Sequence, residues 1–311
     1  MYIEQDSFIS FSDCSSIYSL IFSFIKSKIM RIRGLMLVSI VLLLGIIALT
    51  LHLLAVGSSR WKITKRDRDP AMGPVSYGLW KRCEYINMTI IKQGVALGVR
   101  SNVEICRPNR YMRFSPDKFD TCYYIHRQCP VMEASQLPDG CSCRYLPSTK
   151  ALQWLTILAA IFLVLGLLSL YFRAITTPQD DTSNLISSFA PFLCFLLALL
   201  AMITTLILVG AYLRRDTYED YTFPLKTVAN FTTYPQAFDL HSLRNFAKHK
   251  KDSFSHERFV AAEKELRDDA NTHYHTNIGW ATGFEIIATV LLFLVTGATY
   301  LLGTMLRSDN V

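Results

Sequence analysis

Four long apolar runs constrain the fold of this chain more than any other feature of its sequence. Leu35–Val56, Ala151–Phe172 and Phe189–Leu213 contain no Asp, Glu, Lys or Arg, and Ile278–Leu306 contains one acid, Glu285. A helix needs about 20 predominantly apolar residues to cross a bilayer, and each run reaches that length. Buried helices of soluble proteins seldom combine this length with so little charge. The runs therefore predict four membrane spans.

The spans predict a transmembrane all-α four-helix bundle, to which the cysteine and strand patterns of the first long loop, described below, add a small disulfide-pinned extracellular antiparallel β-sheet. Only 18 % of the residues are charged, against roughly 25 % in an average soluble domain, which agrees with this class. The predicted segments are an N-terminal cytosolic segment (1–33), a first span (34–57), extracellular loop 1 (58–150), a second span (151–172), a cytosolic loop (173–188), a third span (189–213), extracellular loop 2 (214–277), a fourth span (278–306) and a cytosolic C-terminus (307–311).

Basic residues before the first span set the expected orientation. They are Lys26, Lys28, Arg31 and Arg33. Cationic residues flanking a span stay on the cytosolic side, so we expect the N-terminus in the cytosol. Four spans return the C-terminus to the same side, in a multi-pass protein of the plasma membrane. Met30 fits an internal start site, in which case residues 1–29 would be a dispensable extension.

Cysteine usage agrees with an extracellular loop 1. Six of the eight cysteines fall in it: Cys83, Cys106, Cys122, Cys129, Cys141 and Cys143. An even set confined to one exposed loop predicts a disulfide framework in an oxidising compartment, although six cysteines allow 15 pairings. Zinc is the alternative, because Cys141 and Cys143 could both ligate it, but no partner pair stands at zinc-finger spacing. We therefore predict no metal and no cofactor.

Two sequons for N-glycosylation fall on the same predicted side. Asn87-Met-Thr lies in loop 1 and Asn230-Phe-Thr lies in loop 2. Both loops are expected to face the lumen of the secretory pathway, where glycans are added, so both asparagines are predicted glycosylation sites.

Local patterns predict the secondary structure of the loops. Ser76–Trp80, Tyr85–Ile91 and Val95–Val99 are rich in β-branched and aromatic residues, which predicts short antiparallel strands, with a turn at 93–94. In loop 2, Ser253–Ala270 predicts a helix that packs on the loop 1 sheet. Its apolar stripe would comprise Phe254, Phe259, Val260 and Leu266.

Charge and motifs exclude several functions. Loop 1 carries 16 Lys and Arg against 8 Asp and Glu, so its surface suits an acidic partner domain, glycans or anionic lipid headgroups. No nucleic-acid recognition motif is present, and we predict no nucleic-acid partner. No Ser-His-Asp or Cys-His arrangement, phosphate-binding loop or H-E-x-x-H motif occurs, so we predict that the protein is not an enzyme.

A motif after the first span resembles that of a known family. Trp61 is followed by Gly78-Leu79-Trp80, Cys83 and later Cys106, which is similar to the W…GLWxxC…C signature of the claudin and peripheral-myelin-protein superfamily. Within it, the chain most resembles the voltage-gated calcium channel gamma subunits and stargazin-like auxiliary subunits. A sequon near the GLW motif at Asn87 and the fourth-span start Gly279-Trp280 carry this similarity.

The resemblance implies four spans, cytosolic ends and an extracellular sheet pinned by one disulfide. We accordingly expect Cys83 to pair with Cys106. Cys122 and Cys129 would then pair with Cys141 and Cys143, in an order that stays open. The aromatic residues of the motif would seat the sheet on the helix ends, and Gly78 would permit a bulge or a close backbone approach.

The resemblance also implies a non-catalytic auxiliary subunit that modulates gating or trafficking. Its expected partners are the pore-forming subunits of a voltage-gated calcium channel or an ionotropic glutamate receptor, together with membrane lipid. The alternative is a claudin-like cell–cell adhesion or junction protein. The C-terminal Ser308-Asp-Asn-Val311 fits a PDZ-domain ligand. Glu285, the acid within a span, is either a functional group or a hydrogen-bonding partner of neighbouring spans.

Overall fold

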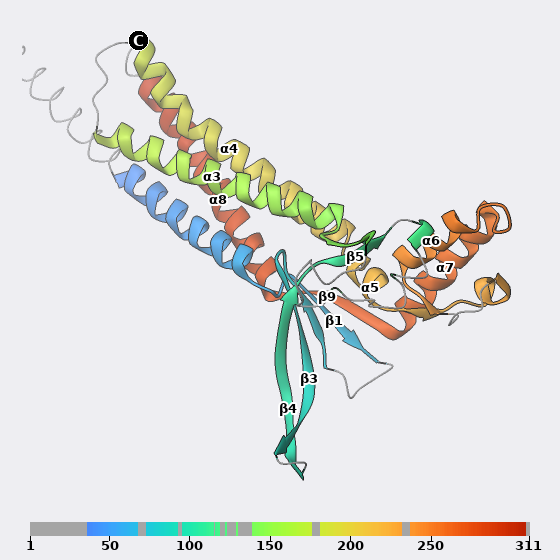
Figure 1. Cartoon of the computed structure of the whole chain (residues 1–311). Helices are drawn as coiled ribbons and strands as arrows, with labels where there is room; N and C mark the ends of the chain where they lie inside the picture. The colour runs from blue at the N-terminus through green and yellow to red at the C-terminus, as the bar shows by residue number, and fades with distance from the viewer. Residues whose placement is uncertain are drawn as a thin grey trace, which may run out of the picture.

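The protein consists of a bundle of long helices with a folded head at one end (Figure 1). The computed structural model describes residues 36–67, 73–92, 95–114, 116–118, 122, 129, 139–175, 181–231 and 237–308. We use "the head" for the described residues 58–146 and 212–279, which lie between the spans. The predicted N-terminal segment 1–33, the turn at 93–94 and the end of the PDZ ligand at 309–311 lie outside the described residues.

Four helices are long and apolar enough to cross a membrane, as expected of a multi-pass membrane protein. They are the first span Met36–Gly57, α3 Pro147–Ile175, the Phe189–Ala211 part of α4 Asp181–Ala211, and the Trp280–Thr304 part of α8 Trp280–Ser308. Two helices exceed the predicted spans: α3 begins at Pro147, a residue suited to the first helical position, and α4 begins inside the predicted loop 173–188. Both long loops leave the bundle at the same end, where they form the head (Figure 1).

The bundle packs around a core of small, branched and aromatic side chains. Ala159, Leu163, Phe195 and Ala288 have no exposed surface. Gly166 of α3 admits the ring of Phe195 from α4, since a Cβ there would lie 2.6 Å from the ring. Because lipid tails provide no hydrophobic drive for association, such close approaches are what hold membrane helices together.

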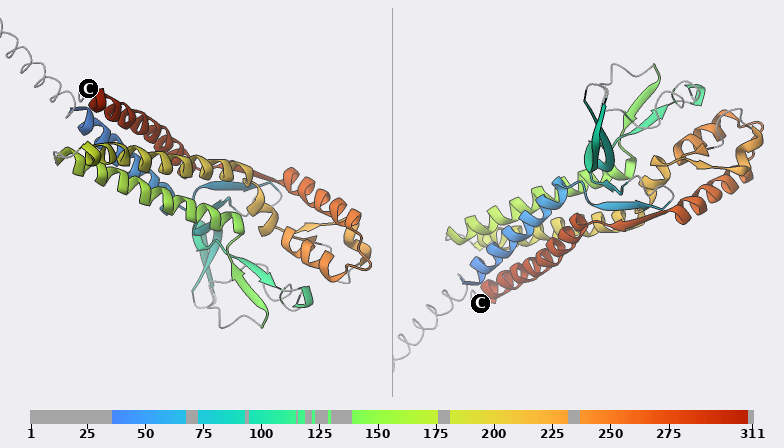
Figure 2. Two further views of the ribbon diagram at one scale, coloured as in Figure 1. Left: turned by 90° about the horizontal axis from the view of Figure 1, so that it is seen from above. Right: turned by 90° about the horizontal axis from the view of Figure 1, so that it is seen from below.

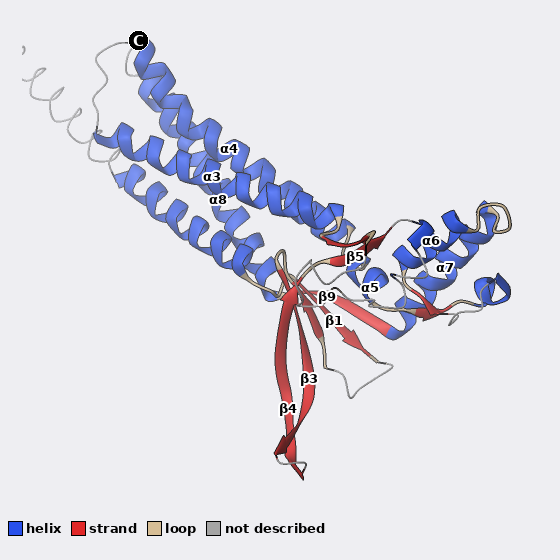
Figure 3. Cartoon of the chain, viewed as in Figure 1, coloured by secondary structure: helices blue, strands red, loops and turns tan. Residues whose placement is uncertain are grey.

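The head contains a five-stranded antiparallel sheet in the order β4-β3-β2-β1-β9. Its strands are β1 Lys62–Arg66, β2 Val75–Tyr77, β3 Lys81–Lys92, β4 Val95–Pro108 and β9 Tyr274–Ile278. The β3–β4 hairpin extends well beyond β1 and β2 (Figure 3). The predicted strand Ser76–Trp80 is interrupted: β2 ends at Tyr77, and residues 78–80 connect it to β3, with Gly78 N donating to Lys81 O at 2.8 Å.

The fifth strand, β9, was not predicted. It comes from loop 2 and pairs along its whole length with β1, from Lys62 opposite Ile278 to Arg66 opposite Tyr274. The segment Tyr-His-Thr-Asn-Ile follows a helix directly and has no clear alternation, so only the distant partner β1 reveals it as a strand. The sheet therefore joins both loops.

A second, smaller sheet of loop 1 lies beside the start of α3. It pairs β5 Tyr111–Phe114 with β6 Cys141–Arg144, and the short helix η1 Pro116–Lys118 follows β5. Disulfides join Cys122 to Cys141 and Cys129 to Cys143, which supplies the order that the sequence left open. The cystines pack with Met112 as a small core of their own.

Loop 2 folds into a helical unit with its own apolar core. Its elements are α5 Arg215–Asp220, β7 Phe223–Pro224, η3 Lys226–Phe231, β8 Ala237–Phe238, α6 Leu240–His249 and α7 His256–His273. The fully buried core residues include Phe223, Leu225, Val228, Phe238 and Leu243. Two views show α6 and α7 directed away from the spans (Figure 2).

Helix α7 differs in two ways from its prediction. It begins after Ser255, whose hydroxyl caps Arg258 N, and its buried residues are Ala262, Leu266 and Ala270, while Val260 is 51 % exposed. Helix α7 reaches the sheet only through β9, the strand that loop 2 adds to it, among the stronger contacts, and otherwise packs on α5, α6, η3 and β7 of its own loop. Aromatic residues spread through loop 2 provide most of the core on which the helix packs, and Phe114 of loop 1 is partly buried against it.

Candidate functional site at the junction of head and spans

The motif residues meet at the junction where the sheet contacts the helix ends. Trp61 and Leu79 are 2 % exposed and pack with Ala55, Leu152 and Ala281 of three spans. The indole N–H of Trp61 donates to the Ala55 carbonyl at 2.6 Å. Trp80 is partly buried against the same cluster. The motif side chains thus lie between the sheet and the bundle.

Two glycines of the motifs permit close backbone approach. A Cβ on Gly78 would lie 2.5 Å from the Ser58 carbonyl oxygen, and one on Gly279 would lie 2.0 Å from that of Arg60. Gly279 N also donates to the Trp61 carbonyl at 2.8 Å. The start of the fourth span is therefore held against the residues that follow the first. Trp280 points outward and is 47 % exposed.

Alanine at Gly279 is expected to destabilise the protein by about 1–3 kcal/mol or more, since its Cβ would collide with backbone rather than with a movable side chain. The matched control is Gly283→Ala, one helical turn further along α8, where a Cβ meets nothing within 4 Å. Alanine there should be neutral or stabilising by up to about 1 kcal/mol, because it favours helix over glycine. Thermal unfolding of the purified protein in detergent measures both, and equal effects would contradict the proposed contact.

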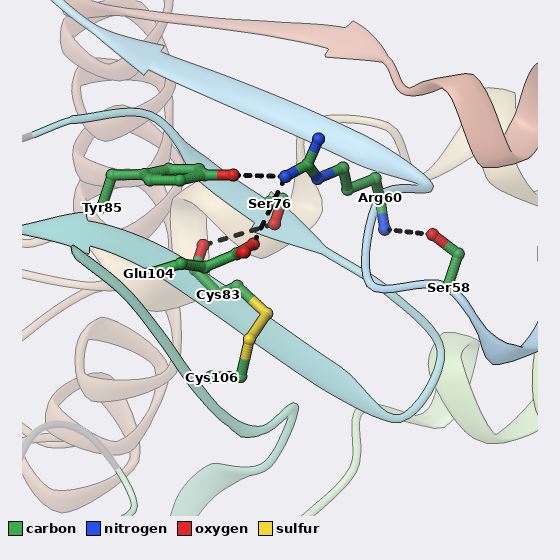
Figure 4. The surroundings of a disulfide bond; sticks show 7 residues. All are labelled: Ser58, Arg60, Ser76, Cys83, Tyr85, Glu104 and Cys106. Atoms are coloured by element: carbon green, nitrogen blue, oxygen red, sulfur yellow. Dashed lines mark hydrogen bonds and ion pairs between the residues drawn. A yellow bond between two sulfur atoms is a disulfide. The ribbon is translucent and has the colours of Figure 1, made fainter. Parts of the chain in front are cut away.

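A disulfide lies beside this junction (Figure 4). Cys83 and Cys106 occupy directly opposed positions on β3 and β4 and are bonded, with an S–S distance of 2.02 Å. Arg60, after the first span, bonds to the Tyr85 hydroxyl and lies 3.6 Å from the Glu104 carboxylate. The two sulfurs and Glu104 are close enough to hold an ion, but sulfurs bonded to each other are not thiolate ligands.

A network of buried charges links the sheet to α5, the short helix that follows α4. The Lys62 ammonium lies 2.8 Å from the Asp216 carboxylate, and the Arg82 guanidinium lies 2.5 Å from that of Asp220. The hydroxyls of Tyr111 and Tyr77 donate to the same two carboxylates, at 3.0 and 2.8 Å respectively. Burial, and then the neighbouring carboxylate, raises the pKa of Tyr77 and of Tyr111 well above the usual range, so both hydroxyls stay protonated as donors.

Three threonines extend this network to β9. The Thr64 hydroxyl lies 2.9 Å from that of Thr276 and 3.3 Å from that of Thr217. Thr217 and Thr276 are 3.0 Å apart. Strands β1 and β9 and helix α5 therefore share a single polar contact in the interior of the head.

A second charged cluster joins the small sheet to loop 2. The Glu219 side chain is fully buried, 4.0 Å from Arg113 and from Arg215. Burial raises the pKa of Glu219, and the arginines oppose this shift only in part. Arg113 donates to His241 Nδ1 at 2.5 Å, and burial together with the neighbouring cations lowers the pKa of His241 to about 3. His241 is therefore neutral near pH 7 and accepts at Nδ1.

Within the spans, the acid Glu285 has a partner. His52 Nδ1 lies 2.8 and 3.0 Å from the two carboxylate oxygens, and both side chains have no exposed surface. His52 Nε2 lies 3.0 Å from the Thr156 carbonyl oxygen, which can only accept, so Nε2 carries a proton. A second proton must then lie between Nδ1 and the carboxylate. The pair is neutral overall in either arrangement and joins the first span to α3 and α8.

The remaining predicted sites lie apart from this junction. Asn230 is exposed in η3. Asn87 lies in β3 at a break in the register with β4, between Ile86 and Met88, and its side chain lies outside the described part. Among the small residues of the spans, Gly45 and Gly166 face other helices, while a Cβ at Gly283 or Gly297 would enter open space.

Sequence reasoning missed α5 and the pairing of His52 with Glu285. The segment Arg-Asp-Thr-Tyr-Glu-Asp at 215–220 has the composition of a solvated surface, yet residues 216–220 are buried. The one available signal was the position of these acids, directly after a span and across from a strongly basic loop. No protein-family model matches the chain, and no curated protein matches its sequence.

Proposed function

We propose that this protein is a non-catalytic auxiliary subunit, similar to the calcium channel gamma and stargazin-like subunits of the claudin superfamily. It would bind the pore-forming subunits of a voltage-gated calcium channel or an ionotropic glutamate receptor and modulate gating or trafficking. The observation that supports this proposal is the polar junction, in which Lys62–Asp216 and Arg82–Asp220 fasten the sheet to the extension of the third span.

A fastened junction suits a modulator for a physical reason. An auxiliary subunit shifts a channel equilibrium only by contacting two channel states with different free energies. A head that moved freely on its spans would absorb a partner's movement without resisting it. Separating a buried ion pair costs free energy, so the head and the bundle resist a partner's movement as one rigid body.

The proposed site of action is the plasma membrane, with both long loops outside the cell. Three disulfides in loop 1 suit an oxidising compartment. The basic residues before the first span favour a cytosolic N-terminus. Both termini of the bundle would then be cytosolic, and Asn230 would be accessible to glycosylation.

The test is to purify the tagged full-length protein from its native tissue in mild detergent and to identify the co-purifying proteins by mass spectrometry. Recovery of calcium channel or glutamate receptor pore subunits at fixed stoichiometry is the expected result. Current recordings from that channel, with and without the protein, would then measure modulation. If only further copies of the protein and junctional scaffold proteins co-purify, the proposal is overturned in favour of cell–cell adhesion.

A further inference from the structure

Four exposed cations gather where the head meets the start of α3. They are Lys81, Arg110, Arg144 and Lys150, which we call the basic collar. They come from three separate parts of loop 1 and from the first turns of the second span. These residues are spread over some seventy positions of the sequence, so only the fold makes them neighbours.

The strand register places the collar residues next to one another. Lys81 begins β3 opposite Pro108, and Arg110 follows β4 two residues later, with its guanidinium 5.3 Å from the Tyr145 ring centroid. Arg144 pairs with Tyr111, which follows Arg110 directly. The chain then enters α3 at Pro147, and Lys150 lies in its first turn. The β5–β6 sheet accordingly lies beside the start of α3 (Figure 1).

Trp154 fixes the height of the collar relative to a membrane. It is 65 % exposed, and tryptophan favours the boundary between hydrocarbon and headgroups. Tyr171, which is 52 % exposed, stands 17 residues further along α3, or about 26 Å, close to the roughly 30 Å of a hydrocarbon core. The two aromatic residues thus mark opposite faces of the membrane.

Lys150 lies one helical turn above Trp154, on the same face of α3 and about 6 Å further from the membrane centre. The headgroup layer of each leaflet is about 5–8 Å thick. The Lys150 ammonium is therefore at the depth of lipid phosphates, and the other collar residues lie on or beside the strands that lead into α3. No ion pair with an acid is formed by any of the four collar residues among the described residues.

We propose that the basic collar binds the phosphate groups of phospholipids in the leaflet beneath the head, with a preference for anionic headgroups. Lysine and arginine at this depth attract anionic lipid by up to about 1 kcal/mol each, or about fivefold in affinity. Position favours lipid over an acidic protein domain as the occupant, because Lys150 stands on a helix just where it leaves the hydrocarbon and the other cations lie on or beside the strands that lead into this helix. This inference is independent of any channel partner.

The experiment is tryptophan quenching by brominated lipid. Full-length protein with Trp280→Phe, which leaves Trp154 as the strongly exposed tryptophan, is reconstituted in phosphatidylcholine vesicles containing brominated phosphatidylserine. We expect phosphatidylserine to be enriched next to Trp154 relative to brominated phosphatidylcholine. Glutamine at all four collar positions should lower this enrichment at least about tenfold, and Lys150→Gln alone up to about fivefold.

The matched control replaces four other exposed lysines by glutamine: Lys248, Lys250, Lys251 and Lys264. Lys248 lies on α6, Lys264 on α7, and Lys250 and Lys251 in the turn between these helices, which point away from the spans (Figure 2), so lipid enrichment should remain unchanged. Equal losses in both variants would overturn the proposal, since net charge alone would then explain binding. The proposal would also be overturned if the folded four-glutamine collar variant kept its phosphatidylserine enrichment. It would be overturned as well if that variant lost an acidic co-purifying protein but kept its lipid preference.

Discussion

Leucine at His52 is expected to destabilise the protein by about 3–5 kcal/mol, whereas glutamine at Glu285 should cost less than about 1 kcal/mol. Removing His52 leaves the Glu285 carboxyl buried without its partner. A glutamine amide can instead donate to Nδ1 of a neutral imidazole whose Nε2 still donates to Thr156. Glutamine is an adequate replacement for Glu285 because its amide N–H can take the place of the proton that lies between the carboxylate and Nδ1 of His52.

The two single leucine variants should differ. Glu285→Leu leaves a neutral histidine that lacks one hydrogen bond, at about 1–3 kcal/mol, so it should be milder than His52→Leu. The double leucine variant should recover much of the loss, because no polar group is left unpaired. Unfolding in mixed detergent measures all four variants. Thr204→Val serves as a control, since its hydroxyl bonds only within its own helix and faces outward. Additive losses in the double variant would contradict the pairing.

Alanine at Asp220 is expected to be equally severe, at about 3–5 kcal/mol. Asp220 is the acceptor for Arg82 and for the Tyr77 hydroxyl, and the Arg82 and Asp220 side chains are each 1 % exposed. Only the Nη1 atom of Arg82 donates to Asp220, and its Nε and Nη2 atoms have no hydrogen-bond partner among the described residues. Without Asp220 the guanidinium would remain buried and unpaired.

The exposed acid Asp252, in the turn between α6 and α7, provides the control for this prediction. Alanine there should change stability by less than about 0.5 kcal/mol. Replacing both members of the pair, with Arg82→Met and Asp220→Leu, should cost less than Asp220→Ala alone, because neither substitution then leaves a buried charge without its partner. Chemical unfolding at constant pH separates these outcomes. A double variant as unstable as the sum of its parts would contradict the account.

The spans and the seating of the sheet could be predicted because their signals are local. Run length alone predicts four helices able to cross a membrane, and Gly78 was correctly predicted to permit a close backbone approach, whereas Gly279 was noted only as the start of the fourth span. Trp61 and Gly279 lie far apart in sequence, yet each carries a recognisable local pattern. Physical constraints on single segments, such as bilayer thickness or the absence of a Cβ, can be read from one sequence.

The head's polar interior could not be predicted, because burial of a charge depends on a distant partner. Asp216 and Asp220 have the same local pattern as solvated acids, and only the approach of Lys62 and Arg82 permits their burial. Strand β9 is similar, since its sequence is ambiguous without β1. Likewise, His52 and Glu285 each stood out as polar residues in spans, but nothing in either run relates one to the other.

The pairing of β1 with β9 has a consequence for how this protein is made. Thr64 and Thr276 are 212 positions apart, so a ribosome adding about 5–20 residues per second completes β1 some 10–40 s before its partner emerges. During that interval one edge of the sheet is open to incorrect partners. The strand that pairs with β1 directly precedes the fourth span, so the head can be completed only as the last helix is delivered. A chain truncated before residue 274 would leave β1 permanently without this partner, a defect that quality control in the secretory pathway could detect.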